Sequence, residues 1–191
     1  MAELPDPRPE ADAAVLVEMQ RMAAARDHSD GRAELGSVYV AMFNNPDVAR
    51  RVGALGEHLR FGATLPDHIR ETVILRYAAR RELAYEWGHH VRPAKLAGLS
   101  DEIISALADA VVPTVLDPVQ RAAVEAVDDV VADGEISVAV QHALAEAVGN
   151  AGVVELVALC GLYALMGYMT TAFAIDLEPG LPGLPRVSSN L

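Results

Sequence analysis

The chain has 191 residues, of which 52% are hydrophobic and only 5% aromatic, and its formal net charge at pH 7 is −12. This length suits one domain with a real core, and the charge argues against a nucleic-acid partner because an acidic surface repels phosphates. The single cysteine excludes an intrachain disulfide, and the acidic, proline-rich start of the chain is unlike a signal peptide. We therefore expect a cytoplasmic protein.

Helix-forming patterns fill the chain between two proline-containing ends. We expect a flexible N-terminal tail at residues 1–12, one helical domain at 13–178 and a flexible C-terminal tail at 179–191. The alternation typical of strands is missing almost everywhere, and no convincing repeat or low-complexity linker interrupts the domain. The sequence therefore predicts an all-α fold.

The first predicted helix covers residues 13–26, a run of good helix formers. The asparagine and proline at 45–46 form a cap with proline at the first helical position, which opens a helix to about Arg60. Residues 64–67 repeat this device before a helix that reaches about Arg81. Apolar residues at a 3.6-residue period predict the buried face of that helix. They are Ile69, Val73, Ile74 and Tyr77.

The next predicted helix covers about 82–96 and ends before Gly98, a residue that favours the left-handed conformation found at helix ends. Ser100 caps a further helix, and an aspartate followed by proline at 117–118 opens another that reaches about residue 133. Ser137 begins a short helix, and an apolar helix closes the domain.

The closing helix contains Leu156–Ile175, a run of twenty residues without a charge, which is about the length that spans a bilayer. Acidic residues flank the run on both sides, and no Lys or Arg is placed to set an orientation in a membrane. An apolar helix in a soluble protein is a central core helix or a subunit interface. We therefore expect a homo-oligomer that does not enter a membrane.

Polar residues that could carry chemistry lie on the two helices between residues 67 and 96. Glu86 and His90 are four residues apart and share one helix face, as do His68 and Glu71 on the preceding helix. If the two helices form a hairpin, Glu71 can face the Glu86 and His90 pair. A carboxylate beside an imidazole is suited to proton transfer near neutral pH, although such a pair is also common on helix surfaces.

The sequence here resembles a known family. The run at 64–76 (TLPDHIRETVILR) and the run at 85–90 (YEWGHH) are similar to characteristic segments of carboxymuconolactone decarboxylase and alkylhydroperoxidase-D-like proteins. Residues 44–46, and residues 154–157 with Tyr163, resemble an upstream and a late segment of that family. The resemblance implies an all-helical fold that assembles as a trimer, hexamer or related oligomer.

The peroxidase branch of this family uses two cysteines, a histidine and an upstream glutamate. The resemblance places those positions at Leu83, Glu86, His90 and Glu71, so both thiols are missing. Two thiols are needed to alternate between dithiol and disulfide. Cys160 lies in the apolar helix, where a small buried hydrophobe is the simpler interpretation. Thiol peroxidase activity is not expected.

The branch without cysteines includes the decarboxylase that gives the family its name. This resemblance implies an acid/base lyase or isomerase that acts on a small, cyclic carboxylated metabolite without a cofactor. Decarboxylation of such a substrate needs proton transfer and a cationic site for the carboxylate. We expect Glu71, Glu86 and His90 to transfer protons.

Four further residues are candidates for substrate binding. His89, Arg76 and Arg92 could supply charge, and Trp87 could contact the substrate. A lone tryptophan beside such a site is also a natural packing anchor between helices. Of the adjacent histidines, only one can face squarely into a given pocket, because neighbours on a helix point about 100° apart.

Two alternatives to catalysis stay open at this point. The chain could be a non-catalytic oligomer that binds a small molecule. It could also hold a metal ion through Glu71, Glu86 and one or both adjacent histidines, because a Glu-x-x-His step occurs in helical metal proteins. Ligands are few for such a site, and we expect no metal.

Overall fold

The computed structural model describes residues 4–30 and 34–185, and in these ranges it contains helices and no strand. The all-α prediction is confirmed. The helices are α1 (Ala13–Asp30), α2 (Ser37–Met42), α3 (Pro46–Glu57), the π-helical turn η1 (His58–Gly62), α4 (Asp67–Arg80), α5 (Ala84–Leu96), α6 (Asp101–Ala106), α7 (Pro118–Val131) and α8 (Val138–Ala172).

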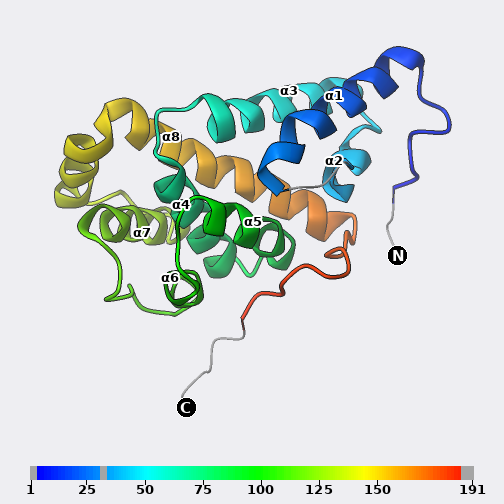
Figure 1. The fold of residues 1–191 in the computed structure, drawn as a ribbon. Helices are drawn as coiled ribbons and strands as arrows, with labels where there is room; N and C mark the ends of the chain where they lie inside the picture. Colours follow the sequence, from blue (N-terminus) through cyan, green and yellow to red (C-terminus); the bar gives the residue numbers. More distant parts are fainter. Residues whose placement is uncertain (1–3, 31–33, 186–191) are drawn as a thin grey trace.

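The long helix α8 crosses the molecule, and α3 packs on it from one side while α4 and α7 pack from the other (Figure 1). Helix α4 contacts α5, α7 and α8, so it lies at the centre of the packing. Residues 69–78 of α4 are buried without interruption. A polar side chain on this helix therefore enters the interior wherever it points.

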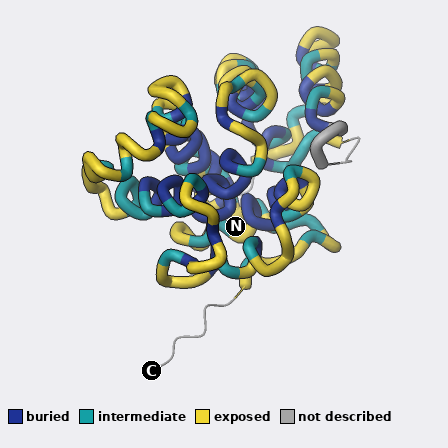
Figure 2. Tube along the Cα trace, turned by 60° about the vertical axis from the view of Figure 1, so that its left-hand side comes forward, coloured by how far each residue is buried: buried dark blue, intermediate teal, exposed yellow. Residues whose placement is uncertain are grey.

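The predicted apolar face of α4 is confirmed, because Ile69, Val73, Ile74 and Tyr77 all belong to the larger of two hydrophobic core clusters. The opposite side of the same helix supplies Leu75 to the second cluster. Figure 2 shows the resulting pattern, with buried segments inside and exposed turns around them. Two faces of one helix thus connect the two clusters into a continuous interior.

Helix α8 is long and apolar enough to span a membrane by length and composition alone. In the structure Leu156 and Leu159 are fully buried in the larger core cluster, as expected for a core helix. The other face of α8 is exposed and carries Val154, Val157 and Tyr168. The sequence predicted two helices here, and the structure joins them across a break at Gly149, whose φ of 72° is left-handed.

Most helix starts agree with the cap signals in the sequence. Asn45 accepts a hydrogen bond from the Val48 backbone, and Asp117 forms a complete capping box with Gln120. Three features differ from the prediction. The cap expected at residues 64–67 is not formed, because Pro66 itself precedes α4 and no side chain caps the helix. Helix α2, a short segment without a side-chain cap, was not predicted, and the helix expected to reach Arg60 changes to a π-helical turn at residues 58–62.

The described part of the C-terminal tail predicted at 179–191 is mostly exposed and makes two local contacts with the domain. Leu184 is partly buried against the second core cluster, and the Pro182 carbonyl lies 3.0 Å from where a Cβ on Gly88 would stand. At the N-terminus, Asn44 donates a hydrogen bond to the Pro5 carbonyl. The outer parts of both predicted tails, residues 1–3 and 186–191, lie outside the described residues.

Candidate active site between α4, α5 and α8

A tight turn brings the two predicted site helices together. Only three residues separate α4 from α5, and the middle one, Glu82, has a left-handed φ of 55°. The turn folds α5 back onto α4, as the hairpin hypothesis required. As a result the Glu71 Oε2 atom lies 2.8 Å from Nδ1 of His90, and both side chains are buried.

A third residue completes a hydrogen-bonded chain. The hydroxyl of Tyr163, from α8, lies 2.9 Å from Nε2 of His90, and the two rings meet edge to face. Tyr163 was part of the family resemblance, but we did not predict it as a site residue. The signal was available, because a phenol in an otherwise apolar buried helix needs a polar partner.

Glu86 lies one turn before His90 on α5 and is also buried. Its Oε1 atom has no hydrogen-bond partner among the described residues. Glu86, His90 and Tyr163 line the same cavity, which measures about 50 Å³. A buried carboxyl oxygen without a partner is costly in a folded protein and is a common feature of functional sites.

Burial determines the protonation of two groups at the cavity. Desolvation raises the pKa of Glu86 to about 8, and the nearby Arg60 only partly opposes this shift. Desolvation also raises the pKa of Tyr163 well above its ordinary value. At neutral pH the cavity therefore presents two uncharged acids, a carboxylic acid and a phenol.

Glu71 and His90, which are hydrogen-bonded to each other, both have lowered pKa values. Burial alone would raise the pKa of Glu71, but its contact with His90 and the positive charges of Arg60 and Arg70 outweigh burial and lower it. Burial lowers the pKa of His90 despite the neighbouring carboxylate. Glu71 is thus a carboxylate at neutral pH, and His90 is a neutral imidazole that donates its Nδ1 proton to it.

His89 also reaches the cavity, but from its edge. Its Nε2 lies 2.8 Å from Oε2 of Glu178, in the C-terminal segment, and its ring packs against Tyr85. Glu178 also accepts hydrogen bonds from Ser37 and Tyr85. These contacts hold the C-terminal segment across the end of α5 that borders the cavity.

The remaining predicted binding residues do not line the cavity. Trp87 is buried in the second core cluster, as the packing interpretation suggested, and Arg92 is exposed. Arg76 is fully buried and binds both carboxylate oxygens of Asp128, at 2.8 and 2.6 Å. A guanidinium removed from water needs such a partner, so Arg76 is a structural residue in this fold.

Arg60, which was not predicted as a site residue, places a positive charge at the cavity. It lies in the π-helical turn η1 and lines the cavity with Glu86, His90 and Tyr163. Its charge acts on the pKa of each of these three groups. Short π-helical segments are frequent at functional sites, but they leave no clear signal in a single sequence.

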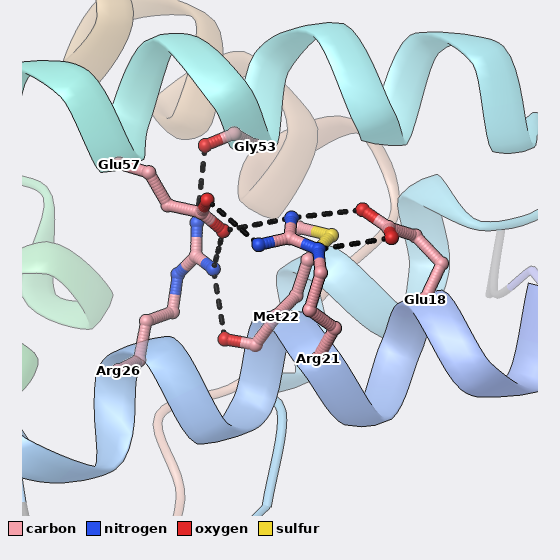
Figure 3. Close-up of polar contacts among 6 residues, drawn as sticks. All are labelled: Glu18, Arg21, Met22, Arg26, Gly53 and Glu57. Atoms are coloured by element: carbon pink, nitrogen blue, oxygen red, sulfur yellow. Dashed lines mark hydrogen bonds and ion pairs between the residues drawn. The ribbon is translucent and has the colours of Figure 1, made fainter.

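A second guanidinium on the cavity wall is fixed in place. Arg26 donates hydrogen bonds to the Met22 carbonyl, the Gly53 carbonyl and the Glu57 carboxylate, joining α1 to α3 (Figure 3). Glu57 also binds Arg21, which contacts Glu18 (Figure 3). The network ties α1 to the end of α3, directly before the π-helical turn that carries Arg60.

A second, larger hollow of about 430 Å³ borders Glu71. It is lined by Glu71, Arg70, Arg60 and apolar side chains that include Phe61 and Leu96. Arg60 borders both spaces. Glu71 thus receives hydrogen bonds from Arg70 at 3.2 Å and from His90 at 2.8 Å, one on each oxygen.

Neither a metal cluster nor a reactive thiol is found at the cavity. Within residues 4–30 and 34–185, no three His, Cys, Asp or Glu side chains converge in a way that could hold a metal ion. Cys160 is buried in the larger core cluster, does not line the cavity, and has a pKa raised to about 12 by burial. A thiol at such a pKa is a poor nucleophile.

Comparison with known proteins supports the fold and the resemblance seen in the sequence. Residues 46–129 match the profile of the Carboxymuconolactone decarboxylase family. The debrominase Bmp8 in its apo form superposes with a TM-score of 0.73 at 14% sequence identity, covering 88% of this chain and 90% of that chain. The values are the same for a cysteine-to-alanine variant of Bmp8 in complex with 2,3,4-tribromopyrrole.

A protein of unknown function from Agrobacterium tumefaciens, named in connection with the antioxidant defence protein AhpD, gives a TM-score of 0.63 at 18% identity. That comparison covers 72% of this chain and 94% of the other. Among curated proteins, no sequence matches the chain. At these identities the structural similarities show the fold, and the chemistry has to be argued from the cavity.

Proposed function

With a carboxymuconolactone decarboxylase family segment at residues 46–129 as the premise, we propose that the chain is an acid/base enzyme, a lyase or isomerase. Its substrate is a small carboxylated metabolite with a carbonyl group. If the reaction is a decarboxylation, the substrate is cyclic. One observation carries the proposal. Glu86, whose Oε1 atom has no hydrogen-bond partner in the described part of the chain, lines the same cavity as His90, and the ring of His90 is hydrogen-bonded to Glu71.

Glu86 is the general acid in this proposal. Its pKa of about 8 keeps it protonated at neutral pH, so it can donate a hydrogen bond or a proton to a substrate oxygen. A carboxylic acid held neutral by an apolar site stabilises the negative charge that develops on an enolate oxygen. A substrate oxygen would also give the Oε1 atom the partner that it lacks.

The His90 and Glu71 pair is the base side of the same site. The neutral imidazole can accept a proton, and the carboxylate that holds its Nδ1 hydrogen stabilises the imidazolium that forms. Two carboxyl groups in one site thus have opposite protonation states, Glu71 ionised and Glu86 neutral. Such a separation of pKa values assigns the acid and base roles.

Arg60 is the residue best placed to bind the substrate carboxylate, because it lines the cavity from the side of η1. This assignment replaces Arg76 and Arg92 as the source of positive charge. The cavity of about 50 Å³ holds only a few water molecules as it stands. A substrate therefore has to displace part of the wall, and we propose that it displaces His89, a lining residue that is hydrogen-bonded to Glu178 of the C-terminal segment.

Thiol chemistry forms no part of the proposal. The positions that would carry the two peroxidase cysteines are Leu83 and Glu86, and Cys160 lies outside the cavity. We also propose that the protein is cytoplasmic and self-associates as a trimer or hexamer. The exposed apolar face of α8, with Val154, Val157 and Tyr168, supports self-association.

The first experiment follows carbon dioxide release from γ-carboxymuconolactone by the wild type and by a Glu86→Gln variant. The control is Glu146→Gln, which makes the same change at an exposed position of α8. Release by the wild type and the control, with a loss of about 100-fold or more in Glu86→Gln, supports the proposal. A folded wild type that releases nothing contradicts the decarboxylase assignment, and equal rates in all three proteins contradict the role of Glu86.

A further inference from the structure

We propose that Tyr163 is the residue that exchanges a proton with the substrate, and that His90 acts only through it. This inference rests on the proposed acid/base function and deepens it. It also limits the substrate class to carbonyl compounds in which the reacting carbon is next to the carbonyl or conjugated with it. Four observations at the cavity carry the argument.

The first observation is that His90 has no ring nitrogen left for a substrate. Its Nδ1 is 2.8 Å from Glu71 and its Nε2 is 2.9 Å from the hydroxyl of Tyr163. The ring is almost completely buried, with 4% of its residue surface exposed. A proton that reaches His90 from the cavity must therefore arrive through the oxygen of Tyr163.

The second observation fixes the direction of the hydrogen bonds. The Glu71 carboxylate can only accept, so the Nδ1 atom of His90 carries the hydrogen. The neutral ring then has its lone pair on Nε2, which accepts the hydroxyl hydrogen of Tyr163. A hydroxyl, an imidazole and a carboxylate in this order form the arrangement in which the hydroxyl oxygen is the reactive atom.

The third observation is that the two acids face the same space. Tyr163 and Glu86 both line the cavity of about 50 Å³, and the Oε1 atom of Glu86 has no partner in the described part of the chain. One substrate can therefore contact the phenol with its reacting carbon and the carboxylic acid with its carbonyl oxygen. Arg60 lies on the wall of this space.

The fourth observation concerns charge. Burial holds the pKa of Tyr163 well above its ordinary value, so the free site contains a neutral phenol. A phenolate without compensation would be costly here. Transfer of the phenolic proton to His90 would create an imidazolium between the phenolate and the Glu71 carboxylate, which offsets that cost.

The proton-transfer step balances with these groups alone. The Tyr163 hydroxyl proton passes to Nε2 of His90 while the phenolic oxygen takes the proton of the substrate C–H bond. The electron pair of that bond forms a carbon–carbon double bond, and the carbonyl π pair moves to oxygen, which takes the proton of Glu86. The products are an enol, a Glu86 carboxylate and a His90 imidazolium paired with Glu71.

Return of the protons at another carbon completes an isomerisation. If a C–CO₂⁻ bond breaks in place of the C–H bond, its electron pair follows the same route to the carbonyl oxygen. Tyr163 then donates its proton to the carbon, and one proton from water restores the site. Both reactions need a carbonyl group to receive the electron pair, which is why the substrate class follows from the arrangement.

A test that needs no substrate uses histidine labelled with ¹⁵N and nuclear magnetic resonance at pH 7. The signals of His90 are assigned by their loss in a His90→Gln variant. We expect the hydrogen on Nδ1 and an unprotonated Nε2, and a changed Nε2 shift in Tyr163→Phe. A hydrogen on Nε2 in the wild type would make Tyr163 only an acceptor and would overturn the inference.

The kinetic test compares Tyr163→Phe with Tyr168→Phe, the same change at an exposed position of α8. With γ-carboxymuconolactone as the probe, Tyr163→Phe should lose about 100-fold or more in kcat, and Tyr168→Phe should keep the wild-type rate. Near-ultraviolet circular dichroism checks that each variant is folded. A folded Tyr163→Phe with the wild-type rate overturns the inference and leaves the proposed function intact, whereas an inactive wild type contradicts the proposed function itself.

Discussion

Glu86 and His90 lie one turn apart on α5 and border the same cavity, yet their polar atoms are in opposite situations. Both ring nitrogens of His90 have hydrogen-bond partners, whereas Oε1 of Glu86 has none in the described part of the chain. One residue is therefore held in place by its neighbours, and the other is available to a ligand.

Replacement of Glu86 by Gln should stabilise the protein increasingly as the pH rises. The pKa of Glu86 is about 8 in the folded chain and about 4.5 when it is unperturbed. Between these values the folded state keeps a proton that the unfolded state releases, so each pH unit costs the wild type about 1.4 kcal/mol of stability. Urea unfolding at pH 5 and pH 8 measures the effect, and a difference between the two proteins that does not grow with pH contradicts it.

The rate of the proposed reaction should fall above about pH 8, because Glu86 loses the proton that it donates. The rate should also fall at acid pH, because a protonated His90 cannot accept a proton. Burial lowers the pKa of His90, so this acid limb should lie below the ordinary histidine pKa of 6.5. A profile of kcat/KM against pH locates both limbs. The alkaline limb should be absent in Glu86→Gln, and its persistence there would assign it to another group.

Arg60→Gln should weaken substrate binding and shift the alkaline limb. Loss of a charged hydrogen-bond donor to the substrate carboxylate should raise KM by about 10-fold or more, with a smaller effect on kcat. The same change should move the alkaline limb to higher pH, because the Arg60 charge lowers the pKa of Glu86. Arg51→Gln, at an exposed position of α3, is the control. An unchanged KM would show that Arg60 does not contact the carboxylate.

Arg76→Ala should lower the free energy of unfolding, although Arg76 does not line the cavity. The change removes the two-point partner of Asp128, which keeps only Arg80 at 3.3 Å, and removes the Arg76 donor from the carbonyls of Leu107 and Asp109. A loss of about 3 to 5 kcal/mol is expected for breaking a buried pair. Chemical denaturation of Arg76→Ala and of Arg51→Ala compares a buried with an exposed arginine. Similar stabilities would mean that the buried pair contributes little.

Local spacing explains which site residues could be predicted. Glu71, Glu86 and His90 lie on two adjacent helices, so helix periodicity and one short turn were enough to bring them together. Arg76 is five residues after Glu71, which places it about 140° around the helix at ~100° per residue, and its guanidinium binds Asp128 of α7 and the carbonyls of Leu107 and Asp109. The spacing rule itself therefore argued against Arg76.

Contacts between distant elements could not be predicted in this way. Tyr163 meets His90 across 73 residues of sequence, and a pairing of that kind depends on how α8 crosses the hairpin. Arg60 lines the cavity from η1, where the chain departs from the α-helical geometry that the sequence pattern predicts. The Pro and Gly residues of the C-terminal segment predict a flexible tail, and they give no signal for the contact of Leu184 with the second cluster.

The contact between that segment and α5 gives the last prediction. A Cβ on Gly88 would stand 2.6 Å from Cδ1 of Leu177 and 3.0 Å from the Pro182 carbonyl, so Gly88→Ala should displace the segment. The displacement should break the hydrogen bond between His89 and Glu178 and open the cavity. Hydrogen exchange of residues 176–185 should become faster in this variant.

Gly161→Ala is the matched control, because it also changes a helical glycine but its new Cβ would meet nothing within 4 Å. That variant should be neutral or more stable by roughly 0.5 to 1 kcal/mol, since alanine favours the helix. If Gly88→Ala has the same exchange rates and stability as Gly161→Ala, the segment is not held by its fit against Gly88. If hydrogen exchange of residues 176–185 is faster only in Gly88→Ala, and this variant also binds γ-carboxymuconolactone faster, the C-terminal segment covers the entrance to the cavity.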